Sequence, residues 1–270
     1  MEAEPLNEWV KKSLELANSQ GYLDRLSQIY PSTIPPSRPL EVTVKKEIEH
    51  FHAQGDWQSL LKKLFELTRK GHPFPIEHPY ASILRQKPKL IESNPQTFQQ
   101  LGQIILSMKI EDIIRGCERP VDINRAMGSA FRGWLKRYFS AQGYAFLQES
   151  QFEKSRGPAF FDGPNAAILQ FINKKLHISL DRGRDFLFKL GDKYVVGEAR
   201  FLSTAGGSQT RDLLETINFV KSVKKHLIAL AVVDGIVWFH GQYVRKLSRL
   251  EKDEYALSAL LLKEFLESLR

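Results

Sequence analysis

Hydrophobic residues recur at helical spacing through the first part of the chain. In the first predicted helix the apolar positions on one face are Leu6, Trp9, Val10 and Leu14. The same periodicity predicts further helices over about 42–53, 56–70 and 96–115. Two proline-rich stretches, 31–39 and 71–80, mark loops, because proline fixes φ and lacks an N–H. Residues 1–115 are therefore predicted to form a helical N-terminal region.

The second half of the chain mixes helical and strand-like patterns. Helices are predicted over about 123–138, 164–176, 208–225 and 253–270. Strand-like runs cover 185–190, 194–202, 226–233 and 236–239. Gly191-Asp192-Lys193 has hairpin spacing between the first two runs, and Asp234-Gly235 predicts a second hairpin between the last two. The order of elements predicts an α/β (α+β) fold for residues 116–270.

Composition adds a general indication of a polyanionic partner. The 270 residues include 39 Lys and Arg against 31 Asp and Glu, which gives a formal net charge of +8 and a pI of about 9.4. Such a balance suits nucleic acid, although proteins without acidic partners share it. Cys117 is the one cysteine, so no intrachain disulfide can form, and a reducing, cytoplasmic location is expected.

Several other classes of protein lack support in the sequence. No apolar run approaches the roughly 18 residues of a membrane helix, and the acidic N-terminus shows no secretory signal, so no membrane partner is expected. The histidine pairs His50–His52 and His72–His78 do not have the ligand spacing of zinc sites. Glycine-rich phosphate loops of the dinucleotide-binding or Walker type are absent from the sequence, so no nucleotide cofactor is indicated.

The stretch RDFLFKLGDKYVVGEARF, residues 184–201, carries the candidate chemistry. Asp185 begins one predicted strand, and Glu198 and Arg200 leave the same face of the next. Pairing of these strands can bring both carboxylates together, which is costly unless a hard divalent cation lies between them. Mg²⁺ binds few protein carboxylates, lowers the pKa of bound water and stabilises charge on a phosphodiester under attack. An adjacent cation could orient that water.

This pattern, an acid, a hairpin and then Glu-x-(Lys) on the next strand, resembles the PD-(D/E)XK nuclease superfamily. Residues 160–217 resemble type II restriction endonucleases in particular, with a GEARF strand, a Gly-Gly loop and a helix that begins with glutamine. Residues 119–135 show a weaker similarity. The resemblance implies a restriction-endonuclease-like core with a central mixed sheet flanked by helices, over residues 116–270. The helical region would then provide dimer contacts, DNA recognition or both.

The resemblance also implies a function and the residues that perform it. It implies a Mg²⁺-dependent enzyme that hydrolyses phosphodiester bonds in double-stranded DNA at a short specific sequence. A homodimer is expected if the target is palindromic. A cognate DNA methyltransferase would act on the same sequence without having to bind this protein. Asp185 matches the first metal-binding acid and Glu198 the second, while Arg200 stands where the family usually has lysine.

The arginine at position 200 leaves three interpretations open. Arginine stays protonated and cannot act as a general base, but it can hold a water molecule or a phosphate oxygen. Arg200 could therefore do the electrostatic work of the lysine. Alternatively Lys189, four residues after Asp185 on its strand, could reach into the site. In the third interpretation the site binds metal and DNA without cutting.

Other polar residues are weaker candidates for DNA contacts. Asp122 could be a third acid from the preceding helix, or only the cap of that helix. The predicted DNA-binding residues are Asn124, Arg125, Arg132, Gln209 and Arg211. For each of them an ordinary role in helix packing or on a solvated helix surface is an alternative.

Two further functions compete with the nuclease hypothesis. The first is a non-cleaving DNA-binding protein with a degenerate nuclease fold. The second is a protein-interaction module whose basic charge is incidental, in which case DNA binding would lack the salt dependence of phosphate contacts. Without the similarity over 160–217, an exposed ion pair at a hairpin edge would be the favoured explanation of Glu198 and Arg200.

Overall fold

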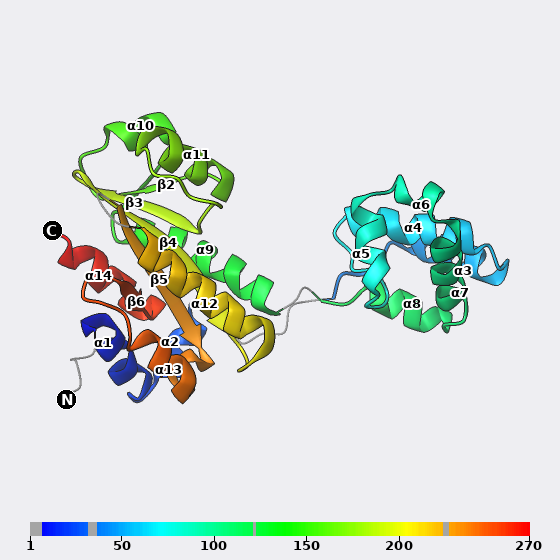
Figure 1. Cartoon of the computed structure of the whole chain (residues 1–270), viewed down its shortest axis with the longest axis horizontal. Coiled ribbons are helices and arrows are strands. Elements are labelled where there is room, and N and C mark those ends of the chain that lie inside the picture. Colours follow the sequence, from blue (N-terminus) through cyan, green and yellow to red (C-terminus); the bar gives the residue numbers. More distant parts are fainter. Residues whose placement is uncertain (1–6, 32–36, 121–122, 224–226) are drawn as a thin grey trace. The chain divides into compact units, whose positions relative to one another are not determined.

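The chain folds into two units, each with its own hydrophobic core (Figure 1). The computed structural model describes residues 7–31, 37–120, 123–223 and 227–270. One unit, called here the sheet unit, comprises the described parts of residues 1–33 and 123–270, and the helical unit comprises those of 34–122. The helical unit is thus an insertion between the second and the ninth helix of the chain. The predicted helical region, residues 1–115, begins and ends at other residues than the helical unit.

The helical unit contains α3 (Val42–Ala53), α4 (Trp57–Arg69), α5 (Pro79–Gln86), α6 (Leu90–Ser93), α7 (Pro95–Leu106) and α8 (Ile110–Cys117). The helices predicted over 42–53 and 56–70 are confirmed. The single helix predicted over 96–115 is instead two helices, because Lys109 adopts an extended conformation before α8. The apolar faces of these helices bury Leu60, Leu61, Leu64, Leu101 and Ile105 completely.

The sheet unit is built on a six-stranded mixed sheet in the order β1-β2-β3-β4-β5-β6. The strands are β1 (Ala145–Leu147), β2 (Ala159–Phe161), β3 (Phe186–Leu190), β4 (Lys193–Leu202), β5 (Leu227–Gly235) and β6 (Tyr255–Leu257). β3 is antiparallel to β2 and β4, whereas the pairs β1–β2, β4–β5 and β5–β6 are parallel. The predicted hairpin between β3 and β4 is confirmed. β5 is apolar along most of its length because both of its faces are covered.

Helices cover both faces of this sheet. They are α1 (Glu8–Ala17), α2 (Tyr22–Ser27), α9 (Ile123–Ala141), α10 (Glu149–Lys154), α11 (Asn165–Lys175), α12 (Gly207–Ser222), α13 (Gly241–Leu247) and α14 (Leu262–Ser268). α9 and α12 pack against opposite faces of the central strands (Figure 1). Phe131 of α9 contacts Phe186 of β3, with ring centroids 6.2 Å apart, and Phe219 of α12 lies on the other face. No helix within the described segments is long and apolar enough to cross a membrane.

The first two helices belong to the sheet unit because tertiary contacts hold them there. α1 packs beside β6, and the Asn7 side chain donates hydrogen bonds to the carbonyl oxygens of Glu251 and Glu254 at 2.7 and 2.9 Å. Tyr22 and Tyr30 are buried against the end of β5. Helical periodicity identified α1 but carried no information about which part of the chain it packs against.

Two predictions near the C-terminus were wrong. Residues Ile236–Trp238 form the 3-10 helix η1 rather than the second strand of a hairpin. Gly235 has φ +88°, and the Trp238 indole donates to the Val233 carbonyl at 2.9 Å, so the chain curls over the end of β5. The helix predicted over 253–270 starts only at α14, after β6 and the 3-10 helix η2 (Ala259–Leu261), because pairing with β5 takes the earlier residues.

Candidate active site

The β3–β4 hairpin places the two predicted acids opposite each other. Phe186 faces Gly197 in the strand register, and the backbone N–H of Asp185 donates to the Gly197 carbonyl at 3.0 Å. Asp185 therefore precedes β3 directly beside Glu198 of β4. The side chain of Asp185 is 11% exposed and that of Glu198 only 2%. Both carboxylates thus lie at one end of the hairpin in a largely buried setting.

Asp185 faces a cavity that is lined by residues of α9, β4 and α12. Its Oδ2 accepts the Ala199 backbone N–H at 2.9 Å, and its Oδ1 accepts from Arg132 Nη1 at 3.1 Å. The cavity has a volume of about 380 Å³ and is lined by Gly128, Arg132, Asp185, Ala199, Arg200, Phe201, Leu202, Gln209 and Asp212. Three of the predicted residues besides Asp185, namely Arg132, Arg200 and Gln209, therefore gather at this cavity.

The Glu198 carboxylate is enclosed by three arginines. Arg184 Nη1 donates to Oε2 at 2.6 Å, Arg182 Nη2 donates to Oε1 at 3.0 Å, and Arg200 Nη2 also pairs with Oε1. Arg184 is only 5% exposed, and its guanidinium lies 4.0 Å from the centre of the Phe219 ring. Burial lowers the pKa of Arg184, and the neighbouring Glu198 charge opposes this effect.

These contacts belong to one ion-pair network of four arginines and four carboxylates. Its members are Arg132, Arg182, Arg184, Arg200, Asp181, Asp185, Glu198 and Glu215. Arg200 spans the two predicted acids, since its Nη1 also lies 4.0 Å from Asp185 Oδ2. Arg182 connects Glu198 with Glu215 of α12, at 3.2 Å. The network is formally neutral.

Arg182 and Arg184 were not among the predicted site residues. They lie in the run Asp181-Arg182-Gly183-Arg184 directly before the first acid. Their position next to Asp185 could have identified them as site residues, because residues next to a strand end can reach across to the neighbouring strand. The spacing did not show that both side chains would turn toward Glu198.

Lys189 cannot take the place of the family lysine in this structure. It lies four residues along β3 from Asp185, about 13 Å at the usual rise of a strand. Its Nζ donates to the Glu153 carbonyl at 2.6 Å, and the side chain is buried beside Tyr194. The interpretation in which Lys189 reaches into the site is therefore wrong, because its ammonium group is held at the Glu153 carbonyl.

The predicted DNA-binding residues have different surroundings. Gln209 is 9% exposed and holds the preceding loop, because its Oε1 accepts from Thr204 N and its Nε2 donates to Ser203 Oγ, both at 3.1 Å. Arg211 is exposed on the first turns of α12 and does not line the cavity of Asp185. Asn124 and Arg125 belong to α9, but their side chains lie outside the description, and Asp122 lies outside the described residues.

The chemistry of the two carboxylates fits a hard divalent cation such as Mg²⁺, which takes oxygen ligands and needs only one or two protein carboxylates. Each of their four oxygens nevertheless accepts an N–H group, three of them from arginine. Among the described residues no group of three or more His, Cys, Asp or Glu side chains is arranged to hold a metal ion. Asp185 and Glu198 could hold such an ion together only after an arginine had moved away.

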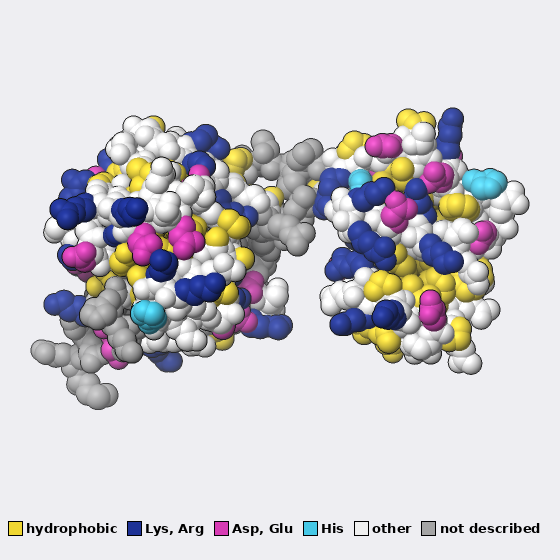
Figure 2. All heavy atoms as spheres, turned by 90° about the horizontal axis from the view of Figure 1, so that it is seen from above, with side chains coloured by type: hydrophobic (Ala, Val, Ile, Leu, Met, Phe, Trp, Pro, Cys, Tyr) yellow, Lys and Arg dark blue, Asp and Glu magenta, His cyan; other side chains and the backbone are white. Residues whose placement is uncertain are grey.

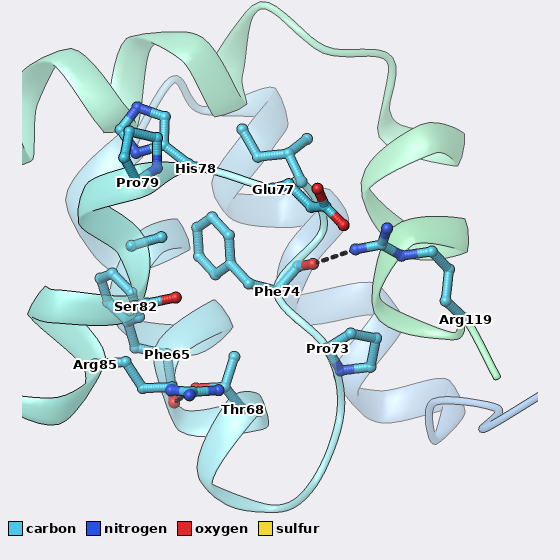
Figure 3. A pocket seen from close by; sticks show the side chains of 12 residues that line it. Phe65, Thr68, Pro73, Phe74, Glu77, His78, Pro79, Ser82, Arg85 and Arg119 are labelled. Atoms are coloured by element: carbon cyan, nitrogen blue, oxygen red, sulfur yellow. Dashed lines mark hydrogen bonds between the residues drawn. The ribbon is translucent and has the colours of Figure 1, made fainter. Parts of the chain in front are cut away.

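The helical unit has a cavity of its own, of about 510 Å³ (Figure 3). Phe65 and Phe74 form a stacked pair at its wall, with ring centroids 5.3 Å apart. Arg119 donates to the Phe74 carbonyl at 2.8 Å, as Figure 3 shows. None of the predicted catalytic residues lines this cavity, so it is separate from the candidate active site.

Surface charge gives no sharper location for a partner. Figure 2 shows Lys and Arg side chains spread over both units and interspersed with Asp and Glu, on the face that it draws. The formal charge of +8 is therefore not gathered into one stripe on that face. Around Asp185 and Glu198 the arginines are matched by an equal number of carboxylates within the ion-pair network.

Comparison with known protein families identifies the family of this chain. Residues 7–269 match the family model of the Tsp45I type II restriction enzyme. The chain has no significant match among curated proteins or among solved structures. The matched stretch includes both units, so the helical insertion and the sheet belong to the same family pattern.

Proposed function

The chain belongs to the Tsp45I type II restriction enzyme family, and we propose that it hydrolyses phosphodiester bonds of double-stranded DNA at a specific sequence with Mg²⁺ as cofactor. The family supports a sequence-specific endonuclease. The finer parts of the proposal are the metal, the residues that hold it and the oligomeric state. The observation that carries the metal and its ligands is the pair of neighbouring acids, Asp185 and Glu198, with Arg200 in contact with both.

Asp185 and Glu198 are the proposed metal ligands. When bound there, Mg²⁺ would lower the pKa of a coordinated water and neutralise charge on the phosphate. Ala199 already orients Asp185 through its backbone N–H, and Arg184 orients Glu198 from the buried side. Both carboxylates are thus held in fixed positions by the chain itself.

Arg200 is the proposed substitute for the family lysine. Its side chain is 32% exposed and lines the cavity of Asp185, where a phosphate oxygen or the attacking water could reach it. Because guanidinium stays protonated, Arg200 would orient the water and stabilise negative charge without removing a proton. Arg132 offers a second cation from α9, with 47% of its side chain exposed to incoming DNA.

A homodimer and a recognition role for the helical unit complete the proposal. A twofold protein would match a palindromic target. The helical unit is inserted in the chain of the sheet unit as residues 34–122. The helix that follows it directly, α9, supplies Arg132 to the site. A DNA methyltransferase of the same specificity would protect the host sequence.

Cleavage of plasmid DNA tests the proposal. The wild-type protein is expected to cut a panel of plasmids into discrete fragments with Mg²⁺ and to leave them intact with a chelator. Asp185→Asn and Glu198→Gln should each lose at least about a thousand-fold in rate, because several kcal/mol of transition-state stabilisation would be lost. Asp192→Asn, a change to an exposed carboxylate in the turn of the same hairpin, is the matched control and should cut normally.

A non-cleaving DNA-binding protein is the second candidate. The observation that favours it is Arg200 itself, together with the arginines that already occupy the carboxylate oxygens. In that case wild type would bind plasmid without cutting it, and Arg200→Lys would create cleavage. This candidate would be eliminated if the wild-type protein cut plasmid DNA and the Glu198→Gln variant did not.

A further inference from the structure

The arginines around Glu198 differ in how firmly they are held. Arg184 is almost fully buried, pairs with Oε2 and lies against Phe219. Arg182 is 41% exposed and Arg200 32% exposed, and both donate to the other oxygen, Oε1. One oxygen of Glu198 therefore has a permanent buried partner, whereas the other has two partners that can move into solvent.

Arg182 has an alternative partner within reach. Its Nη1 lies 3.2 Å from Glu215 of α12 while its Nη2 contacts Glu198. Glu215 is 44% exposed, so Arg182 could keep this contact and leave Glu198 without being buried unpaired. The cost of moving Arg182 is therefore small compared with that of breaking a fully buried ion pair, because Glu198 also keeps its contacts with Arg184 and Arg200.

Electrostatics opposes entry of a cation into the network as it stands. The four arginines balance the four carboxylates of the network, and Asp212 at the cavity adds one negative charge, so an added divalent ion would bring at least one uncompensated positive charge to a mostly buried site. DNA phosphates would supply the missing negative charge and would also attract arginine side chains through paired hydrogen bonds. Metal and DNA are then expected to bind together more favourably than either alone.

We propose that Arg182 is a positioning residue that shares Glu198 Oε1 with Arg200 in the DNA-free protein, so that a divalent cation binds more tightly once Arg182 leaves Oε1 and keeps only Glu215 or a DNA phosphate as its partner. This inference rests on the proposed function, because it deepens the account of the same site. It assigns a role to a residue outside the acid–acid–lysine pattern. It also explains how a family enzyme can carry arginine-paired acids and still use a metal.

Direct measurement of metal binding tests this role without relying on catalysis. Mn²⁺ affinity of the DNA-free protein would be measured by electron paramagnetic resonance for wild type, Arg182→Gln, Arg182→Lys and Arg245→Gln. Arg245 is an exposed arginine on α13 whose Nε donates to the Gly241 carbonyl of its own helix. Arg245→Gln therefore removes the same charge as Arg182→Gln, but outside the ion-pair network. Circular dichroism melting would verify that every variant is folded.

The outcomes separate the role of Arg182 from a general effect of charge. Arg182→Gln is expected to bind Mn²⁺ at least tenfold more tightly than wild type, whereas Arg245→Gln and Arg182→Lys should stay within about threefold of it. Equal affinity of Arg182→Gln and wild type would overturn the proposal, and so would an equal gain in Arg245→Gln. In a second measurement, the wild type should gain Mn²⁺ affinity when a short DNA duplex is added, and Arg182→Gln should gain much less.

Failure of this inference can be distinguished from failure of the proposed function. Plasmid cleavage by wild type without a gain of Mn²⁺ affinity in Arg182→Gln would refute the role of Arg182 alone. A gain of affinity without cleavage of any plasmid would support the role of Arg182 in metal entry while refuting the nuclease. Where cleavage occurs, Arg182→Gln should also reach half-maximal rate at a lower Mg²⁺ concentration than wild type.

Discussion

The buried carboxyl group of Asp234 is fixed by residues distant in the sequence. Its Oδ1 accepts from Ser258 Oγ at 2.6 Å and from the Tyr22 hydroxyl at 3.4 Å, and its Oδ2 accepts from Ala259 N and the Tyr30 hydroxyl at 3.0 and 3.1 Å. Burial raises the pKa of Asp234 to about 7, although these hydrogen bonds act in the opposite direction. The cluster joins α2 and the segment after it to the end of β5.

Asp234 is expected to make the stability of the sheet unit depend on pH. Between about pH 4 and pH 7 the folded protein keeps this proton while the unfolded chain loses it, so stability falls as pH rises through that window and levels off above it. The raised pKa of Asp234 corresponds to a loss of about 4 kcal/mol in the free energy of unfolding across this pH range. Asp234→Asn should remove this part of the slope in urea denaturation measured from pH 4 to 8.

Asp192→Asn serves as the control for that experiment, because Asp192 is exposed in the turn between β3 and β4. It should reproduce the pH dependence of wild type. If Asp234→Asn and wild type showed parallel stability curves between pH 4 and 7, the buried carboxylate would not be the titrating group.

At the scale of secondary-structure elements, Gly235 determines how β5 ends. The residue has φ +88° and ψ −139°, a region that only glycine adopts readily. A Cβ at this position would lie 2.1 Å from the Leu202 carbonyl oxygen of the adjacent strand. The Asp234-Gly235 pair therefore marks a close backbone approach and a change of direction rather than a hairpin turn.

Gly235→Ala is expected to destabilise the protein by more than about 2 kcal/mol, because unfavourable backbone angles and a backbone clash act together. Gly143→Ala is the matched comparison, since Gly143 also has positive φ, +81°, but has open space where a Cβ would point. That change should cost only about 1 kcal/mol. Thermal and urea unfolding of both variants would measure the difference, and similar losses would show that the clash with Leu202 is absent.

At the scale of the whole molecule, the two hydrophobic cores are expected to respond independently to mutation. Leu64 is fully buried in the helical unit and Leu187 is fully buried in the sheet unit. Leu64→Ala should destabilise its own unit by about 3 kcal/mol. Hydrogen exchange of peptides from α3–α8 should then accelerate roughly a hundred-fold, while exchange in β3–β5 stays unchanged.

Leu187→Ala provides the reciprocal experiment. It should accelerate exchange in the strands of the sheet unit and leave α3–α8 as in wild type. Acceleration throughout the chain in both variants would show instead that the units unfold as one cooperative body.

The sequence by itself determined the local features of this protein. Helical and alternating periodicities gave α3, α4, α9, α11, α12 and the β3–β4 hairpin, since these patterns depend on residues close together in the chain. The same hairpin spacing brought Asp185, Glu198 and Arg200 to one place, and their similarity to restriction endonucleases indicated the family.

Tertiary structure alone decided which distant segments pack together. Short strands such as β1, β2 and β6 carry too few residues for a periodic signal and exist only because neighbouring strands supply their hydrogen bonds. The inclusion of α1 and α2 in the sheet unit, the burial of Asp234 and the three arginines around Glu198 likewise depend on side chains that meet only after folding. Burial and charge pairing are set by three-dimensional neighbours, and linear spacing does not specify these.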